Sequence, residues 1–265
     1  YYKTTDMEQN LSKKTRTESD LIGSREVPES ALYGVQTLRG IENFRISKFH
    51  LNEYPLFIQA LAITKMGAAV ANRELDLLTE EQADAILKAC KEILEGKHHD
   101  QFPVDMIQGG AGTTTNMNAN EVIANRALEL MGHQRGEYQY CSPNDHVNRS
   151  QSTNDAYPTA IHIGLYYTHL KLVKHFEVLI ESFRKKATEF AHVIKMGRTQ
   201  LEDAVPMTLG QTFNGFASIL RHEVKNLDFA AQDFLTVNMG ATAIGTGITA
   251  EPESVSYTHL TLPTT

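Results

Sequence analysis

Residues 142–158 read SPNDHVNRSQSTNDAYP and stand directly before a long helical pattern. Small hydroxyl and side-chain amide groups crowd this stretch. Such groups compete with the backbone for hydrogen bonds, so they favour helix caps and turns over helix interiors. A cap needs only one of them. The surplus of neutral donors, where a rigid element begins, predicts a functional role for the loop.

The helical pattern behind this loop decides the fold class. Between Pro158 and Met196, apolar residues recur at spacings of mostly three and four, and Gly164 is the only glycine. The same spacing returns between Leu209 and Phe234. Two helices this long and this periodic predict a helical bundle or coiled-coil packing, with apolar stripes that partners must cover. The expected fold is therefore mainly all-α.

The first half of the chain carries its own helix signals. Pro55 opens a helical pattern, Thr79 and Gln82 form a capping box, and a further helix is expected over 118–131. The expected organisation is a mobile arm over 1–20, a mainly helical domain over 21–140, part of a central helical bundle over 141–253 and a non-native tail over 254–265.

Composition excludes several classes of protein. The net charge is −7 and no Lys/Arg-rich block occurs, which argues against a nucleic-acid partner. Two cysteines make no disulfide framework, and no run of apolar residues is long enough to span a membrane. The sequence therefore predicts a cytoplasmic protein with neither nucleic acid nor membrane as a partner.

Two groups of residues look like cofactor or metal sites but favour simpler interpretations. The glycine-rich segments 109–112 and 240–247 lack the lysine of a phosphate-binding loop, so they indicate tight turns. His98, His99 and Asp100 lie in a polar loop without metal-ligand spacing. We therefore expect no cofactor and no metal.

Three polar loops remain, over 112–116, 150–154 and 197–200. Each alone would be interpreted as a helix cap. Together they predict an anion site built from neutral donors, in which Arg198 either supplies a charge or serves a structural ion pair.

At this point the chain resembles a known family. The segments GGAGTTTNMNANEV (109–122), SPNDHVNRSQSTNDAYPTA (142–160) and MGRTQLEDAVPMTLGQ (196–211) are similar to the aspartase/fumarase superfamily, and the similarity runs over about 21–253. Within it, FPVD at Phe102, GEYQY at Gly136 and the third segment resemble the aspartate ammonia-lyases. The resemblance implies reversible deamination of the dicarboxylate L-aspartate to fumarate and ammonia, by homotetramers whose active sites combine several subunits.

The resemblance also implies roles for particular residues. Anti elimination through an aci-carboxylate needs preorganised donors where negative charge develops. The implied catalytic residues are Thr113, Ser152, Thr153, Asn154, Thr199 and Gln200; the implied substrate-binding residues are Thr113, Asn116, Ser152, Thr153, Asn154 and Thr199. We further expect Thr153 and Asn154 to bind a carboxylate at the start of the long helix, with Asp155 turned away to cap it.

Gln200 separates the possible reactions. The fumarase pattern has His at this position, which suits loss of a hydroxyl, whereas ammonia leaves from an amine that is already protonated. Fumarate hydratase, or another fumarate-producing lyase, stays an alternative. So does an inactive helical assembly protein, although a scaffold has no need of the donor loops. The superfamily's Gly-Ser-Ser loop, with the serine thought to act as base, does not occur in 1–265. The chain by itself is therefore expected to be inactive.

Overall fold

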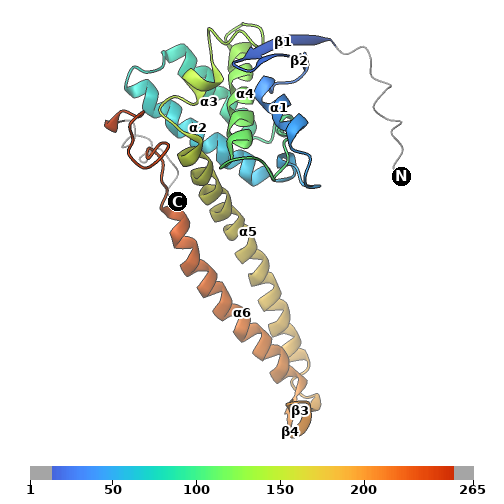
Figure 1. Ribbon diagram of the computed structural model, residues 1–265. Coiled ribbons are helices and arrows are strands. Elements are labelled where there is room, and N and C mark those ends of the chain that lie inside the picture. The colour runs from blue at the N-terminus through green and yellow to red at the C-terminus, as the bar shows by residue number, and fades with distance from the viewer. Residues whose placement is uncertain (1–13, 254–265) are drawn as a thin grey trace, which may run out of the picture. The chain divides into compact units, whose positions relative to one another are not determined.

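A computed structural model describes residues 14–253 (Figure 1). The expected non-native tail and most of the expected N-terminal arm lie outside these residues. The described chain forms two compact units, one made of residues 14–164 with 237–253 and the other of residues 165–236. The architecture is mainly helical with two small sheets, so the predicted fold class is confirmed.

The first unit opens with a β-hairpin in which β1 (Thr15–Asp20) pairs antiparallel with β2 (Gly23–Pro28). The prediction of a mobile arm up to residue 20 was therefore wrong for β1. The polar side chains expected to keep this segment in solvent instead bind it to the protein. Arg16 donates to the carbonyl oxygen of Ala31 over 2.7 Å, and buried Glu18 accepts from the Val35 N–H over 3.0 Å.

Helices build the rest of the first unit. Their bounds are α1 (Val35–Asn43), η1 (Leu51–Glu53), α2 (Pro55–Glu74), α3 (Glu80–Leu94), η2 (His99–Gln101), α4 (Thr113–Leu130) and η3 (Pro143–Val147). The Pro55 start and the capping box of Thr79 and Gln82 are confirmed, and α4 begins before the predicted residue 118. Helix α3 packs on both α2 and α4, and α1 also packs on α4. The fully buried side chains of Leu61, Ile86 and Ile123 come from α2, α3 and α4.

Helix α5 (Thr153–Glu189) begins before Pro158, contrary to prediction. A proline inside a helix leaves the carbonyl four residues earlier without a donor. Here Asn238 Nδ2 donates to that Asn154 oxygen over 3.1 Å, which accommodates the proline. The beginning of α5 is anchored by buried Ala156 and Ala160.

The boundary between units also differs from prediction. The chain passes into the second unit after Gly164, and not near residue 140. The first turns of α5 belong to the first unit because Ala156 and Ala160 are buried there. Residues 237–253 return to the first unit, where Asp155 accepts from the Gly240 N–H.

The second unit contains the rest of α5, β3 (Ile194–Thr199), β4 (Glu202–Thr208), α6 (Leu209–Ala231) and η4 (Gln232–Leu235). The prediction that one helix continues to Met196 was wrong, because α5 ends at Glu189 and an antiparallel hairpin follows. Thr208 caps α6 through a box with Gln211.

Helices α5 and α6 lie side by side in the second unit (Figure 1). The rings of Phe183 and Phe213 are 6.0 Å apart, and His169 Nε2 lies 2.9 Å from Asp228 Oδ1. Many other apolar side chains are exposed, among them Val178, which is 68% exposed, and Phe229, which is 83% exposed. Within residues 14–253, no helix has the length and apolar character needed to cross a membrane.

Candidate active site

The start of α4 is shaped by Gly112. This residue has φ +93°, and a Cβ added there would overlap the ring of Tyr157, so both conformation and close approach require glycine. The preceding loop folds onto the helix start through Gln108. Its Oε1 accepts from the Thr115 N–H over 2.9 Å, and its Nε2 donates to Thr115 Oγ1 over 2.6 Å. Thr113, the first residue of α4, is exposed.

The start of α5 is capped by reciprocal side-chain hydrogen bonds. Ser152 Oγ accepts from the Asn154 N–H over 3.2 Å, and Asp155 Oδ1 accepts from the Ser152 N–H over 2.9 Å. The other carboxylate oxygen of Asp155 accepts from the N–H groups of Gly240 and Thr242, over 3.1 and 2.9 Å. Asp155 is fully buried and faces backbone donors, as expected for a residue that caps the helix.

A buried polar cluster joins the two helix starts. Asn116 in α4 donates from Nδ2 to Thr153 Oγ1 in α5 over 3.0 Å. Lys65 in α2 donates from Nζ to Asn116 Oδ1 over 2.8 Å, and to Asn148 Oδ1 and Gln151 Oε1, each over 2.9 Å. Asn116 is 1% exposed and Lys65 is fully buried. Lys65 was not among the predicted site residues, although a lone lysine in the apolar run LAITKMGAAVA could have drawn attention to it.

Burial and the charge of Asp155 shift the pKa of the Lys65 amine in opposite directions. Burial lowers the pKa of its amine to about 7, while the charge of Asp155 works the other way. The three oxygens around Nζ match the three hydrogens of an ammonium group, so the contacts favour the charged form. Burial also raises the pKa of the nearby Cys90 thiol to about 12, which makes Cys90 a poor nucleophile.

A cavity of about 500 Å³ lies between the loop before α4 and the first turns of α5. Its lining residues are Met106, Ile107, Gln108, Gly110, Ala111, Gly112, Asn154, Tyr157, Pro158 and Ile161. Two helix N-termini therefore border one cavity, and N-termini favour anions through unpaired N–H groups and the helix dipole. Exposed Asn154 donates from its side chain to the Ala243 carbonyl over 2.9 Å.

The predicted site residues divide between the two units. Thr113, Asn116, Ser152, Thr153 and Asn154 gather around the starts of α4 and α5 in the first unit.

Thr199 and Gln200 lie in the β3–β4 hairpin of the second unit. Gln200 has φ +48° and Leu201 has φ +69°, so both central residues of the turn are left-handed without being glycine. Backbone strain of this kind often accompanies functional positions. Arg198 pairs with Asp203 over 2.9 Å, which corresponds to the structural ion pair considered for it.

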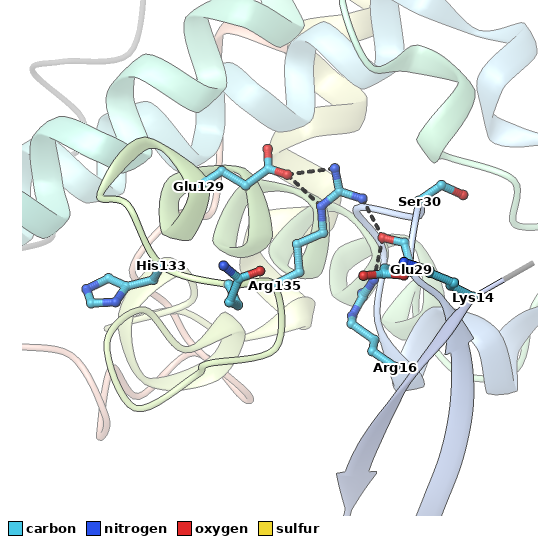
Figure 2. A pocket seen from close by; sticks show the side chains of 8 residues that line it. Lys14, Arg16, Glu29, Ser30, Glu129, His133 and Arg135 are labelled. Carbon is cyan, nitrogen blue, oxygen red and sulfur yellow. Dashed lines mark hydrogen bonds and ion pairs between the residues drawn. The ribbon is translucent and has the colours of Figure 1, made fainter.

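A second cavity of about 730 Å³ lies beside the β1–β2 hairpin, but its two arginines, Arg16 and Arg135, already bind protein oxygens (Figure 2). Arg135 Nε donates to Glu129 over 2.6 Å, and Arg135 Nη1 donates to the carbonyl oxygen of Glu29 over 2.7 Å. Arg16 is similarly bound to backbone oxygens. The described part of the chain also contains no group of three His, Cys, Asp or Glu side chains arranged for a metal ion. The starts of α4 and α5 remain the best candidate site.

Known proteins identify the family to which this chain belongs. A family model described as a lyase matches residues 23–264. The chain belongs to this lyase family. It is 56% identical over 244 residues to the aspartate ammonia-lyase of Escherichia coli (strain K12), covering 92% of the chain and 51% of that protein. It is 55% identical to the aspartate ammonia-lyase of Helicobacter pylori (strain J99 / ATCC 700824) over 238 residues, which are 90% of the chain and 51% of that protein. The chain thus spans about half the length of the curated relatives it matches.

Two solved structures share the fold of this chain. A fumarate lyase:delta crystallin from Brucella melitensis bound to cobalt matches with a TM-score of 0.89 and 50% identity, over 94% of this chain and 54% of that one. A recombinant class II fumarase from Schistosoma mansoni matches with a TM-score of 0.87 and 36% identity, over 94% of this chain and 52% of that one.

Proposed function

We propose that the full-length protein, meaning this chain continued to the length of its relatives, is an aspartate ammonia-lyase. It would convert L-aspartate reversibly to fumarate and ammonia. The observation that carries the proposal is the state of two hydroxyl groups at the start of α5. The oxygens of Ser152 and Thr153 each accept a hydrogen bond from a protein N–H group, so both hydroxyl hydrogens are left to donate to a ligand.

Such donors suit the chemistry of the reaction. Removal of the C3 proton of aspartate builds a second negative charge on the adjacent carboxylate, and donors aimed at that charge lower the barrier. Ser152, Thr153 and Asn154, at a helix N-terminus, would hold a substrate carboxylate. Thr113 would supply a further donor, and Thr199, in the second unit, would supply another in an assembly whose active sites combine several subunits. Identity of 55–56% to the aspartate ammonia-lyases of Escherichia coli and Helicobacter pylori supports these roles.

Gln200 favours deamination over dehydration. A neutral amide cannot give a proton to a leaving hydroxyl, whereas ammonia needs none because it leaves from a protonated amine. Fumarate hydratase is the second candidate, favoured by the likeness to a class II fumarase. An inactive assembly protein is disfavoured because it has no use for oriented hydroxyl donors.

We also propose that the full-length protein assembles as a homotetramer in the cytoplasm and requires no cofactor. The exposed apolar side chains along α5 and α6, among them Leu172, Val178, Ile219 and Phe229, support an assembly that covers them.

The deciding experiment measures fumarate absorbance with the full-length protein, comparing aspartate with malate as substrate. We expect turnover of aspartate and no useful turnover of malate; comparable rates would refute the assignment. Gln200→His should not by itself create a hydratase, because the leaving-group geometry must change as well.

The role of Thr153 is tested separately. Thr153→Val should weaken the binding of substrate and of competing dicarboxylates while the melting temperature stays within a few degrees. If the hydroxyl serves only the fold, the melting temperature will fall and the inhibitor constant will not change.

A further inference from the structure

We propose that Lys65 is a positioning residue of the dicarboxylate site, which acts through Asn116 to set the direction in which the Thr153 hydroxyl donates. The inference rests on the proposed function, because it concerns how that site recognises a carboxylate. Lys65 itself would not touch the substrate: it is fully buried, and its amine contacts three side-chain oxygens of the protein.

The first step concerns the orientation of the Asn116 amide. An asparagine presents an accepting oxygen on one side and a donating NH₂ group on the other. Lys65 Nζ lies 2.8 Å from Asn116 Oδ1, and an ammonium can only donate. The reversed amide would place two donors against each other in a buried site, where unsatisfied polar groups are destabilising. Lys65 therefore holds the amide in one orientation.

The second step concerns the hydroxyl. With its oxygen toward Lys65, Asn116 directs Nδ2 to Thr153 Oγ1 over 3.0 Å and to Asn148 Oδ1 over 3.2 Å. Thr153 Oγ1 is then an acceptor in this contact, so its hydrogen cannot point at Asn116. The hydrogen is left for another acceptor, and Thr153 is the first residue of α5, where a bound carboxylate is favoured.

The third step concerns charge. Asp155 is buried beside the same helix start and acts electrostatically on Lys65. Its oxygens are occupied by the N–H groups of Ser152, Gly240 and Thr242. Asp155 thus balances the charge of Lys65 without competing for Asn116, which leaves the lysine free to orient the amide.

The test compares two substitutions that add the same charge beside Lys65. Asn116→Asp keeps an oxygen toward Lys65 but turns a second oxygen toward Thr153, which captures the hydroxyl hydrogen. Asn148→Asp also places a carboxylate against Lys65 but does not touch Thr153. We would measure succinate binding to the full-length protein by calorimetry, together with kcat, KM and melting temperature.

We expect Asn116→Asp to raise the succinate Kd by about 100-fold, the scale of losing one hydrogen bond to a charged group, and Asn148→Asp to raise it by less than about tenfold. Lys65 gains a counter-charge in each variant, but Asn148→Asp loses the donation to the Gln151 carbonyl oxygen and Asn116→Asp loses the donation to Asn148 Oδ1, so we expect the two melting temperatures to fall by similar amounts. Adding Thr153→Val to Asn116→Asp should weaken binding no further, since residues that act as one unit are not additive. Lys65→Met should match Asn116→Asp if it folds.

Equal losses of succinate affinity in Asn116→Asp and Asn148→Asp would overturn the inference, even if the protein converts L-aspartate. A further loss on adding Thr153→Val to Asn116→Asp would overturn it as well. If only the proposed function is wrong, L-aspartate will not react, yet the variants will keep the expected order of succinate affinities. A parent protein that binds no dicarboxylate would overturn both.

Discussion

Asn238 donates its side-chain N–H to the carbonyl oxygen of Asn154 over 3.1 Å, at the one carbonyl in α5 that Pro158 deprives of a helical donor. We expect Asn238→Ala to lower the free energy of unfolding by about 1 kcal/mol, the usual net contribution of one hydrogen bond. Denaturant unfolding of the full-length protein measures this loss.

The control restores the missing donor. Pro158→Ala supplies an N–H group to Asn154, so Asn238→Ala should cost almost nothing in that background. An unchanged cost would mean that the Asn238 contact does not compensate for the proline.

This pair also shows where sequence reasoning reached its limit. The capping boxes at Thr79 and Thr208 and the Pro55 start depend on neighbours within a few residues, so α2, α3 and α6 could be located from local pattern. The α5 start could not, because Pro158 looks like a first-turn residue until its distant partner Asn238 is known.

The candidate site, too, could be predicted from local sequence only in part. Its hydroxyl and amide donors stand in recognisable loops, so the sequence could indicate them. Lys65 comes from α2, and its three acceptors belong to α4 and the loop before α5. No local pattern connects a lysine in an apolar helix with those amides. The β3–β4 hairpin was missed for another reason: its β3 strand continues the apolar spacing of α5 without a break.

Gly112 offers a test of the contact between the two helix starts. Gly112→Ala should destabilise the protein by about 3 kcal/mol or more, because it adds overlap with the Tyr157 ring to backbone strain at φ +93°. Gly110→Ala is the matched control, with φ +73° but no atom nearer than 3.6 Å to the added Cβ. It should cost only about 1 kcal/mol. Thermal and denaturant unfolding compare the two variants. Similar losses of unfolding free energy would show that the Tyr157 ring moves aside at little cost.

Glu92 predicts a pH dependence of stability. Hydrogen bonding to Arg126, helped by His98, outweighs burial and lowers the pKa of Glu92 to about 2. A carboxyl with a lowered folded-state pKa stabilises the protein above its unfolded-state pKa and loses that effect as pH falls toward the folded-state value. Glu92→Gln should therefore cost about 2–3 kcal/mol near pH 7, and roughly 1 kcal/mol less near pH 4. A cost that does not change with pH would show that the ion pair contributes little.

The hairpin that carries Gln200 contains a second strained residue. Leu201 has φ +69° and is 95% exposed, so neither packing nor conformation favours leucine there. Leu201→Gly should stabilise the hairpin by about 1 kcal/mol, while Leu201→Ala, which keeps the strain, should not. Hydrogen exchange of the β3 and β4 amides measures the difference. Equal protection in both variants would locate the strain elsewhere.

Asp155 allows a fold effect to be separated from a site effect. Asp155→Asn keeps one accepting oxygen but turns an NH₂ group against backbone donors, so we expect a loss of about 2–4 kcal/mol in unfolding free energy. The matched control is Glu121→Gln. Glu121 is also buried and accepts from the N–H groups of Gly34, Gln36 and Thr37, at the start of α1.

Both variants should melt at lower temperature, but only Asp155→Asn should also weaken succinate binding. Asp155 fixes the Ser152 main chain and the Gly240–Thr242 turn around the candidate site, whereas Glu121 fixes a helix that does not line the cavity. Calorimetry well below either melting temperature makes the comparison. If Glu121→Gln weakens binding as much as Asp155→Asn, general loosening of the first unit explains the effect, and Asp155 has no particular part in shaping the start of α5.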